Sequence, residues 1–360
     1  MNDTDTLTLQ VTERIRETPD TLSFVVQPSG KVPVYRAGQF LTLLFEDELG
    51  TKPVRRSYSF ATTPGVDPQW MFTVKKKPNG LVSRYLHDHI GVGDLLHALP
   101  PAGQFVLPPA DGPRDLFLIA GGSGITPLFS ILKEALYNEP DCRILMLYAS
   151  RSEDQIIFRE SLRTLHRAYK DRFELIHLLS NPRSDLLTLR QQLEPAEVYW
   201  GRLSNHMVEK WVDDYSVNDP DRAHFFLCGP RGMMLKATNA LGYKGFGSDQ
   251  VHTENFVIKE ALRPSSEDFP PATVQLERRG QHYEVNVAPG QTILEAAEAM
   301  GLSLPFSCRA GTCATCSGQC TEGRAVMYTQ DGRMDTVSTK GLVFTCVAYP
   351  QTGNLRVIMD

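Results

Sequence analysis

The chain has 360 residues, which is enough for two or three domains of ordinary size. Its hydrophobic fraction of 41% and charged fraction of 22% are those of a packed globular protein, and they exclude a largely disordered chain. The formal net charge of -5 provides no basic footprint, so we expect no nucleic-acid partner.

The first residues have neither the basic start nor the apolar run of a secretory signal. No stretch reaches the ~20 apolar residues that a membrane-spanning helix needs, so we expect no membrane partner. Five of the 7 cysteines lie from Cys308 onward. In a long chain without a signal sequence, clustered cysteines indicate metal binding rather than a disulfide framework. The sequence therefore predicts a cytoplasmic protein with a metal site near the end of the chain.

Short β-rich runs, separated by Pro, Gly, Asn and Asp, fill about the first hundred residues. These runs are 7–11, 22–26, 39–45, 57–61, 70–75 and 94–99. Many short strands at close spacing are typical of an antiparallel sandwich or barrel. The Pro- and Gly-rich stretch 101–113 predicts a boundary, which gives a first domain over residues 1–110.

Near-continuous apolar runs follow, with helix-like stretches at 127–138 and 233–241 between them. The apolar runs are 116–120, 143–149, 173–179 and 224–228. Apolar strands that alternate with helices indicate a parallel sheet covered on both faces. We therefore predict a doubly wound α/β nucleotide-binding domain over residues 111–258.

The last part of the chain predicts a compact α+β module over residues 274–360, after a linker at 259–273 that mixes Pro, Ser and charge. Residues 273–287 alternate as a hairpin, and a short helix is expected after Thr292, which stands at capping-box spacing from Glu295. Late strands are expected at 342–348 and 355–359.

Four cysteines have the spacing C-x4-C-x2-C…C, which is that of plant-type [2Fe-2S] ligation. They are Cys308, Cys313, Cys316 and Cys346. A bacterial [4Fe-4S] run would need a further ligand and a following proline, and a zinc site usually has two C-x2-C pairs. We predict a [2Fe-2S] cluster on these four cysteines and a non-ligand role for Cys320. From about Thr273 onward the chain resembles a plant-type ferredoxin, which implies the β-grasp fold.

The tetrapeptide RSYS resembles the R-x-Y-S flavin motif of the ferredoxin–NADP reductase superfamily. The resemblance implies that Arg56 pairs with a phosphate oxygen, that Tyr58 packs on the flavin, and that the Ser59 hydroxyl reaches the N5 edge. Ser57 completes the motif. Taken alone, the tetrapeptide also fits an ordinary strand with alternating side chains.

The segment NGLVSRYLHD resembles the G-x-x-S phosphate loop of the same superfamily. Gly80 permits a close backbone approach, and Leu81, Val82 and Ser83 are expected to open a helix whose N–H groups face a pyrophosphate. This segment favours FAD over FMN. The order of the domains does not decide between the two flavins, because members with FMN share it.

The segment GGSGITP follows the apolar run 116–120 and departs from the G-x-G-x-x-G fingerprint, but it has the form of the family's nicotinamide-nucleotide loop. The nucleotide-binding residues that it implies are Gly121, Gly122, Ser123, Gly124 and Thr126. The segment CGP resembles a second part of that site, with Cys228 near the nicotinamide C4 and with Gly229 and Pro230 shaping the pocket. A buried cysteine at the end of a core strand is the simpler interpretation of Cys228 alone.

Two further segments bear on the nucleotide. VHTENF resembles the family's closing segment, which makes Glu254 and Phe256 candidates near flavin and nicotinamide, although a surface carboxylate and a core ring would fit equally. Ser150 and Arg151 stand where a 2′-phosphate would bind, and an arginine there suits NADPH. The acidic pair at 153–154 leaves NADH open.

Together these motifs resemble a three-domain flavin and iron–sulfur reductase of the ferredoxin–NADP reductase superfamily, with an FAD-binding barrel, an NAD(P)-binding domain and a C-terminal ferredoxin. Nicotinamide gives two electrons at once whereas the cluster takes one, and a flavin converts between the two. The resemblance implies an NAD(P)H-dependent oxidoreductase that supplies a partner protein such as an oxygenase component. The alternative is a redox-sensing flavoprotein whose cluster is not an electron exit. The implied catalytic residues are Ser59, Thr126, Cys228 and Glu254.

Overall fold

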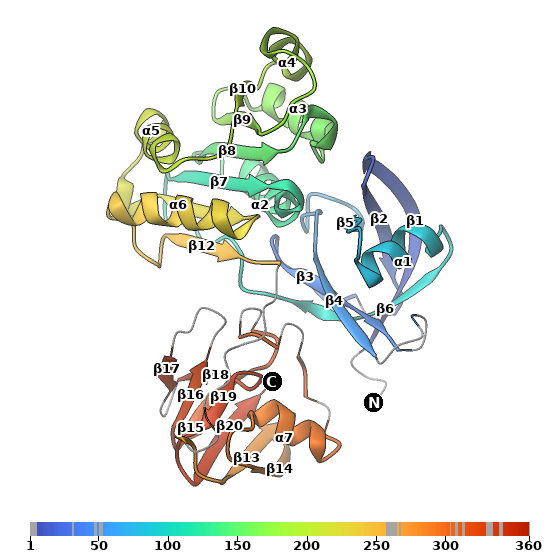
Figure 1. The fold of residues 1–360 in the computed structure, drawn as a ribbon, viewed down its shortest axis with the longest axis vertical. Coiled ribbons are helices and arrows are strands. Elements are labelled where there is room, and N and C mark those ends of the chain that lie inside the picture. The colour runs from blue at the N-terminus through green and yellow to red at the C-terminus, as the bar shows by residue number, and fades with distance from the viewer. Residues whose placement is uncertain are drawn as a thin grey trace. The chain divides into compact units, whose positions relative to one another are not determined.

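The computed structural model describes residues 6–30, 32–46, 49, 53–256, 265, 268–302, 304–306, 309–311, 314–328, 334–337 and 341–359. The chain divides into two compact units. The first comprises Asp5–Pro101 and Phe105–Phe256, and the second holds Val257–Asp360 with two short pieces. Figure 1 labels the elements of each unit, which are taken separately below.

The first sheet has six strands in the order β4-β3-β6-β1-β2-β5 (Figure 1). Their bounds are β1 Leu7–Thr18, β2 Thr21–Pro28, β3 Phe40–Phe45, β4 Val54–Ser59, β5 Trp70–Lys75 and β6 Leu95–Ala102. The pairs β1–β2, β1–β6, β2–β5 and β3–β4 are antiparallel. An antiparallel bridge between Phe60 and Phe72 joins the two ends of this order, so the sheet closes as the predicted barrel. Helix α1, Leu81–His89, packs Val82 and Leu86 into the barrel core.

The second sheet is parallel, with six strands in the order β10-β9-β8-β7-β11-β12 (Figure 1). Their bounds are β7 Asp115–Gly121, β8 Arg143–Ser150, β9 Phe173–Leu179, β10 Glu197–Trp200, β11 His224–Cys228 and β12 Val251–Glu254. The helices are α2 Ile125–Asn138, α3 Arg159–Ala168, α4 Leu186–Leu193, α5 Asn205–Tyr215 and α6 Arg231–Tyr243. Buried side chains of α2, α3 and α4 share one core, and those of α5 and α6 share the other. The predicted doubly wound fold is confirmed.

Two edge strands of this sheet, β10 and β12, were not expected from the apolar pattern. Each has only four residues, and most of their side chains are exposed or half-buried. A strand at the edge of a sheet does not need the continuous apolar run that marks the central strands. The strand order reverses between β7 and β11, and in open α/β sheets ligands bind at such a switch point, outside the carboxyl ends of the strands.

Helix α2 joins the parallel-sheet domain to the barrel through a buried polar cluster. The Thr63 hydroxyl donates to the carbonyl oxygen of Ser130 at 2.8 Å, and the Ser130 hydroxyl donates to that of Thr62 at 2.6 Å. Lys133 pairs with Asp67, which also accepts a hydrogen bond from the Thr63 amide at 2.6 Å. Thr63, Ser130 and Lys133 are buried, so each polar group is satisfied by a partner across the interface. We call these five residues the α2–barrel cluster.

The second unit contains a five-stranded sheet in the order β14-β13-β20-β15-β18 and a three-stranded sheet in the order β17-β16-β19. The larger sheet comprises β13 Ala272–Arg278, β14 Gln281–Val287, β15 Ser317–Glu322, β18 Leu342–Phe344 and β20 Asn354–Met359. The smaller one comprises β16 Ala325–Tyr328, β17 Met334–Val337 and β19 Ala348–Pro350. Helix α7, Ile293–Ala299, packs Leu294 and Ala297 into the same core as Val274 and Val357. This is the predicted β-grasp arrangement.

The helix start in this unit is as predicted, whereas one late strand is not. The Thr292 hydroxyl accepts a hydrogen bond from the Glu295 amide at 3.2 Å, and the Glu295 carboxylate accepts one from the Thr292 amide at 3.1 Å, which completes a capping box. The run 342–348, expected as a single strand, forms β18 and β19 with a turn between them. Cys346 lies in that turn between the two strands, and its side chain is buried in the core of this unit.

No helix in the described part of the chain has both the length and the apolar character needed to cross a membrane.

The α2–barrel cluster gives a test of stability. Asp67→Asn leaves Lys133, which is 7% exposed, without its counter-charge. We expect the free energy of unfolding, measured by urea titration, to fall by about 2–3 kcal/mol. The matched control is Asp214→Asn, which removes the exposed pair with Lys210 and should leave the free energy of unfolding nearly unchanged. Equal effects of the two substitutions would contradict a structural role for the cluster.

Candidate functional site

Ser59 and Glu254, which are 195 residues apart, meet in a hydrogen bond. The Ser59 hydroxyl at the end of β4 donates to Glu254 Oε2 at the end of β12, at 3.2 Å. In the parallel sheet, Glu254 lies opposite Cys228 on β11, and Cys228 lies opposite Ala120 on β7. The end of the flavin-motif strand therefore lies beside the carboxyl ends of the central strands, at the switch point. The structure brings three predicted catalytic residues to one place.

The side chains at this place are uncharged near neutral pH. Burial raises the pKa of Glu254 to about 8, and the hydrogen bond from Ser59 offsets only part of that rise. Burial also raises the pKa of the Cys228 thiol well above its usual range, and the nearby Glu254 carboxyl adds to this effect. A thiol held in its protonated form is a poor nucleophile. The arrangement can orient a bound group but is not equipped for thiolate attack.

The GGSG loop and the CGP segment lie against each other with no space for added side chains. A Cβ atom on Gly124 would come within 2.1 Å of the Cys228 carbonyl oxygen, and one on Gly121 within 2.5 Å of Pro230 Cδ. Gly229 has a φ of +157°, which favours glycine at this position. The glycine-rich loop opens a helix, and the first backbone N–H groups of a helix can bind a phosphate.

The Thr126 hydroxyl has a structural role in this loop. It is 2% exposed and donates to the carbonyl oxygen of Ser123 at 3.0 Å, within the first turn of α2. Helix α6 begins at Arg231, with Pro230 as its N-cap residue rather than its first helical residue. Both segments thus end a strand and open a helix, as the sequence predicted.

Tyr148 was missed by the sequence analysis. Its ring is fully buried, and its hydroxyl donates to the carbonyl oxygen of Gly122 at 3.2 Å and accepts from the Ile157 amide at 3.1 Å. It therefore ties the GGSG loop to the segment that follows β8. A tyrosine within an apolar strand looks like a core residue, and only the register between β7 and β8 places its hydroxyl beside the loop.

The predicted phosphate loop at Gly80 is closed by Ser83. The Ser83 hydroxyl accepts a hydrogen bond from the Lys77 amide at 3.1 Å, and a Cβ on Gly80 would come within 2.3 Å of that hydroxyl oxygen. Helix α1 begins at Leu81, whose side chain is exposed, while Val82 points into the barrel core. The loop is therefore shaped for backbone contacts, with the Val82 side chain turned away.

The remaining residues of the flavin motif become more buried from Arg56 toward the end of β4. Arg56 and Ser57 are exposed, and an Arg56 guanidinium nitrogen donates to the Arg55 carbonyl oxygen at 2.7 Å. Tyr58 is half-buried and tilted against Phe72, with 5.7 Å between ring centroids. Burial raises the pKa of the Tyr58 hydroxyl, so it stays protonated. Arg56 remains accessible for an anionic group.

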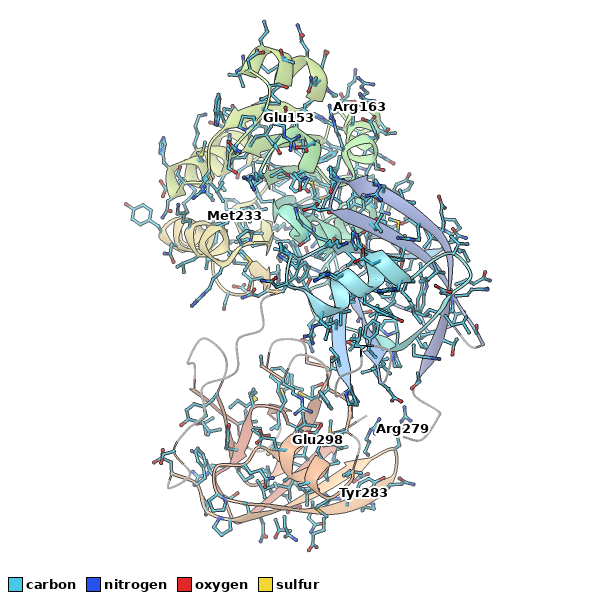
Figure 2. The ribbon with its side chains drawn as sticks, turned by 45° about the vertical axis from the view of Figure 1, so that its right-hand side comes forward. Glu153, Arg163, Met233, Arg279, Tyr283 and Glu298 are labelled. Carbon is cyan, nitrogen blue, oxygen red and sulfur yellow. The ribbon has the colours of Figure 1, made fainter. Side chains whose placement is uncertain are left out.

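Beyond β8, both acidic side chains of the expected ribose region are already engaged. The Glu153 carboxylate (Figure 2) accepts hydrogen bonds from the Arg183 amide at 3.0 Å and the Ser184 amide at 2.9 Å. Burial raises the pKa of Glu153, but these hydrogen bonds outweigh it and lower the pKa overall. Asp154 pairs with the Arg183 guanidinium at 3.1 Å. Arg151 is exposed and Ser150 is buried.

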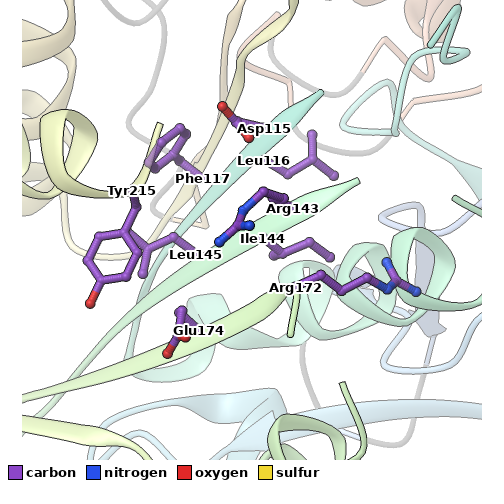
Figure 3. Close-up of a pocket in the computed structure, with 9 residues that line it drawn as sticks. All are labelled: Asp115, Leu116, Phe117, Arg143, Ile144, Leu145, Arg172, Glu174 and Tyr215. Atoms are coloured by element: carbon purple, nitrogen blue, oxygen red, sulfur yellow. The ribbon is translucent and has the colours of Figure 1, made fainter. Parts of the chain in front are cut away.

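A hollow in the parallel-sheet domain lies away from all of these residues (Figure 3). It is lined at the amino ends of β7, β8 and β9 by residues that include Asp115, Arg143 and Glu174. The predicted nucleotide loop lies at the opposite, carboxyl edge of the same sheet. None of the predicted site residues lines the hollow, so it is separate from the candidate site.

In the second unit, hydrogen bonds join the chain segments that contain two predicted cluster ligands, Cys316 and Cys346. Cys316 is 1% exposed and Cys346 is 7% exposed. The Thr345 amide and hydroxyl both donate to the carbonyl oxygen of Cys316, at 3.1 and 3.2 Å. Cys308 and Cys313 lie outside the described residues. Within the described residues, no group of three His, Cys, Asp or Glu side chains gathers as a metal site.

The backbone conformation of the described loop residues fits an iron–sulfur cluster on this loop. Arg309 and Ala314 adopt left-handed backbone conformations, with φ of +53° and +57°, and Gly311 has φ of +71°. Three such residues turn the chain tightly around one point, as a loop that wraps a cluster must do. Cys320 lies on β15, buried, with its thiol directed to the carbonyl oxygen of Glu322 at 3.4 Å. That contact agrees with the predicted non-ligand role.

Three family models match the chain in the predicted order. An oxidoreductase FAD-binding domain matches residues 6–107, an oxidoreductase NAD-binding domain matches 118–239, and a 2Fe-2S iron-sulfur cluster binding domain matches 276–351. The ferredoxin reductase component of 3-ketosteroid-9-alpha-monooxygenase from Mycobacterium tuberculosis (strain CDC 1551 / Oshkosh) is 34% identical, over 98% of this chain and 96% of that protein. The chain belongs to this family of three-domain reductases.

Other relatives agree. A component of the 1,2-phenylacetyl-CoA epoxidase of Escherichia coli (strain K12) is 30% identical over 94% of this chain and 93% of that protein. The solved structure of phthalate dioxygenase reductase has the same fold, with a TM-score of 0.56 and 21% identity over 98% of both chains. The protein is thus an oxidoreductase with FAD-binding, NAD-binding and 2Fe-2S domains, which confirms the predicted family, fold class and cofactor types.

The contact between the GGSG loop and β11 predicts the effect of one added methyl group. Gly124→Ala would push the loop from the Cys228 carbonyl, and we expect flavin reduction by NAD(P)H to slow about 10- to 100-fold, the scale of a ~1 Å misplacement. Anaerobic stopped-flow absorbance measures this rate. The control, Gly242→Ala, adds a methyl group with nothing within 4 Å and should leave the rate unchanged. Equal rates in both variants would contradict the packing argument.

The raised pKa of Glu254 predicts how stability depends on pH. Because its folded pKa of about 8 lies above the ordinary value of 4.5, the folded state loses stability as the pH rises from 4.5 through 8. Glu254→Gln removes this titration. We expect the melting temperature of the variant, relative to the unsubstituted protein, to increase from pH 5 to about pH 8 and to level off above it. A difference that is constant with pH would show that the carboxyl titrates normally.

Proposed function

We propose that this protein is the NAD(P)H-dependent reductase of an oxygenase system and supplies electrons to a separate oxygenase protein. When bound, FAD supplies the conversion of a hydride into single electrons, and the [2Fe-2S] cluster supplies one-electron transfer. The observation that carries the proposal is the hydrogen bond from Ser59 to Glu254. It joins the strand with the flavin motif to the sheet edge with the nucleotide loop, so both partners of a hydride transfer have their binding residues side by side.

The site residues would act by orientation. Ser59, Cys228 and Glu254 form an uncharged surface, and hydride transfer needs alignment of its two partners rather than an acid or a base. Thr126 is a positioning residue, because its hydroxyl holds the first turn of α2. Phe256 is 44% exposed just beyond β12, and we propose that its ring lies against the bound flavin or nicotinamide.

Two sets of backbone and side-chain groups would hold the cofactors. Those for FAD are Arg56, Ser57, Tyr58, Ser59, Gly80, Leu81, Val82 and Ser83. Those for the nicotinamide nucleotide are Gly121, Gly122, Ser123, Gly124, Thr126, Ser150, Arg151, Gly229 and Pro230. The closed loop at Ser83 and the glycine contacts at β11 support these assignments, because each forms a tight turn directly before a helix, and helix N-termini bind phosphate groups.

Cys308, Cys313, Cys316 and Cys346 are the proposed cluster ligands. The burial of Cys316 and Cys346 and the hydrogen bonds of Thr345 support the two described members of this set. We propose domain limits of 1–110, 111–258 and 274–360 with a linker at 259–273, which the matched ranges of the three family models support. A cytoplasmic location is also proposed, because cluster thiolates and the buried thiol of Cys142 suit a reducing compartment.

The relatives support an oxygenase as the electron acceptor. They are named as the reductase of a 3-ketosteroid monooxygenase, a component of a phenylacetyl-CoA epoxidase and the reductase of a glycine betaine monooxygenase. Their substrates have little chemistry in common, whereas all three names specify an oxygenase-type system. What the three systems share is therefore the class of acceptor protein, an oxygenase.

Anaerobic titration of the purified protein with NADPH or NADH tests the proposal and its redox-sensing alternative. We expect flavin and iron–sulfur absorbance to bleach together. Cys346→Ser should remove the cluster signal and leave flavin reduction intact, whereas Cys320→Ala, a buried cysteine outside the proposed ligand set, should keep both. Flavin that becomes reduced while the cluster stays oxidised would contradict an electron exit through the cluster and would favour the sensing role.

A further inference from the structure

Three arginines follow the carboxyl ends of the outer strands of the parallel sheet. Arg151 comes directly after β8, Arg183 comes four residues after β9, and Arg202 comes two residues after β10. The strand order places β8, β9 and β10 side by side, away from the switch point. In a protein with a net charge of -5, a row of cations at one sheet edge is a local exception.

The register brings these strand ends level with one another. Ser150 on β8 lies opposite Leu179 on β9, and Leu179 lies opposite Trp200 on β10. Backbone hydrogen bonds continue the alignment past the strands, from the Asn181 amide to the Arg151 carbonyl at 2.7 Å. With neighbouring strands ~4.8 Å apart, the ends of β8 and β10 are about 10 Å apart. Two long arginine side chains can reach a single anion across that span.

Trp200 is exposed at the same edge. Its side chain is 63% exposed, although tryptophan normally buries most of its large apolar surface. Along β10 it alternates with Tyr199, which packs edge-on against Trp211 with 5.4 Å between ring centroids. No aromatic ring of the described residues packs on Trp200 itself. A flat indole left uncovered beside cations is suited to stack on a planar ring of a ligand that carries negative charge.

The acidic residues near this edge are engaged by other groups and, among the described residues, leave two of the three arginines without a carboxylate partner. Glu153 is held by the amides of Arg183 and Ser184, and Asp154 pairs with the Arg183 side chain. Within the part of the chain that the structure describes, neither Arg151 nor Arg202 has an acidic partner, and both are exposed. Two guanidinium groups thus remain for an external anion, while the third is already paired.

We propose that this edge binds the adenosine end of the nicotinamide nucleotide, with Trp200 stacked on the adenine and Arg202 joining Arg151 on the 2′-phosphate. The inference rests on the proposed function, and it makes NADPH the preferred hydride donor. The GGSG loop holds the pyrophosphate at the end of β7, next to β8, so the adenosine half extends over β8 toward β9 and β10. Guanidinium forks bind phosphate in a bidentate manner, and a diol without phosphate would leave both arginines unpaired.

Calorimetric titration of the full-length protein with 2′,5′-ADP and with 5′-AMP tests the inference without turnover. We expect 2′,5′-ADP to bind at least about tenfold more tightly than 5′-AMP, which corresponds to one charge-assisted contact. Arg202→Gln should abolish most of this preference by weakening only 2′,5′-ADP. Trp200→Ala should weaken both ligands by the same factor, about tenfold, because stacking on adenine does not depend on the phosphate.

The matched control is Arg167→Gln. Arg167 is an exposed arginine in the last turn of α3, a helix that runs away from the carboxyl edge, and its loss should change neither affinity. Equal affinities for the two ligands, or a Trp200→Ala or Arg202→Gln variant that binds like the unsubstituted protein, would overturn the inference. Analytical ultracentrifugation gives a further test. If the unsubstituted protein is a dimer and Trp200→Ala is a monomer, the indole lies in a contact between copies of the chain, and the inference is overturned.

Flavin reduction separates this inference from the proposed function. The unsubstituted protein and Arg167→Gln are mixed anaerobically with excess NADH or NADPH, and reduction of the flavin is followed by its absorbance; the two proteins should react at the same rate. If the unsubstituted protein has no flavin reduction with either nucleotide, the proposed function fails. If reduction occurs but 2′,5′-ADP has no advantage, only the assignment of this edge fails.

Discussion

The structure of the first unit depends on helix α2, because this one element is bound at two places. The GGSG loop directly precedes its first turn. This loop packs against the end of β11 so closely that there is no space for a Cβ atom on Gly124. One turn further on, Ser130 and Lys133 bind the barrel through the α2–barrel cluster. A rigid helix fixed at both places sets the distance between the nucleotide loop and the flavin motif on β4. The position of the chemistry is thus determined by buried polar contacts rather than by the apolar core alone.

The centre of the site is built to be neutral. Glu254, Cys228 and Tyr58 all keep their protons near neutral pH, each chiefly because burial disfavours the charged form. The charged side chains that we propose for cofactor binding lie further out, with Arg56 proposed for a flavin phosphate and Arg151 for the nucleotide. Such a separation lets the protein bind two polyanionic molecules while the reacting rings lie in an environment of low charge. Such a site would act by holding the two rings in a fixed orientation, and hydride transfer between two rings depends on their alignment.

Much of this could be predicted from the sequence. The apolar runs predicted the central strands of the parallel sheet, and the cysteine spacing predicted the type of cluster. Other features depend on contacts between distant residues. The short edge strands β10 and β12 lack an apolar pattern because their side chains are largely exposed. The roles of Tyr148 and Thr126 follow from where their hydroxyl groups donate, which no local pattern encodes. The sequence left NADH open because of the acidic pair at 153–154, and only the structure shows that the loop after β9 binds the Glu153 carboxylate.

The hydrogen bonds of Thr345 bear on how the cluster is assembled. They join segments 29 residues apart, and the pairing of β15 with β18 closes the same stretch of chain. These hydrogen bonds therefore offset part of the entropy cost of closing that loop. Many small metal-binding domains fold only when the metal arrives, since their ligands are otherwise scattered. In this unit the hydrogen bonds of Thr345 hold the segments of two proposed ligands, Cys316 and Cys346, together, so the spacing of these two cysteines depends on the fold of the unit itself.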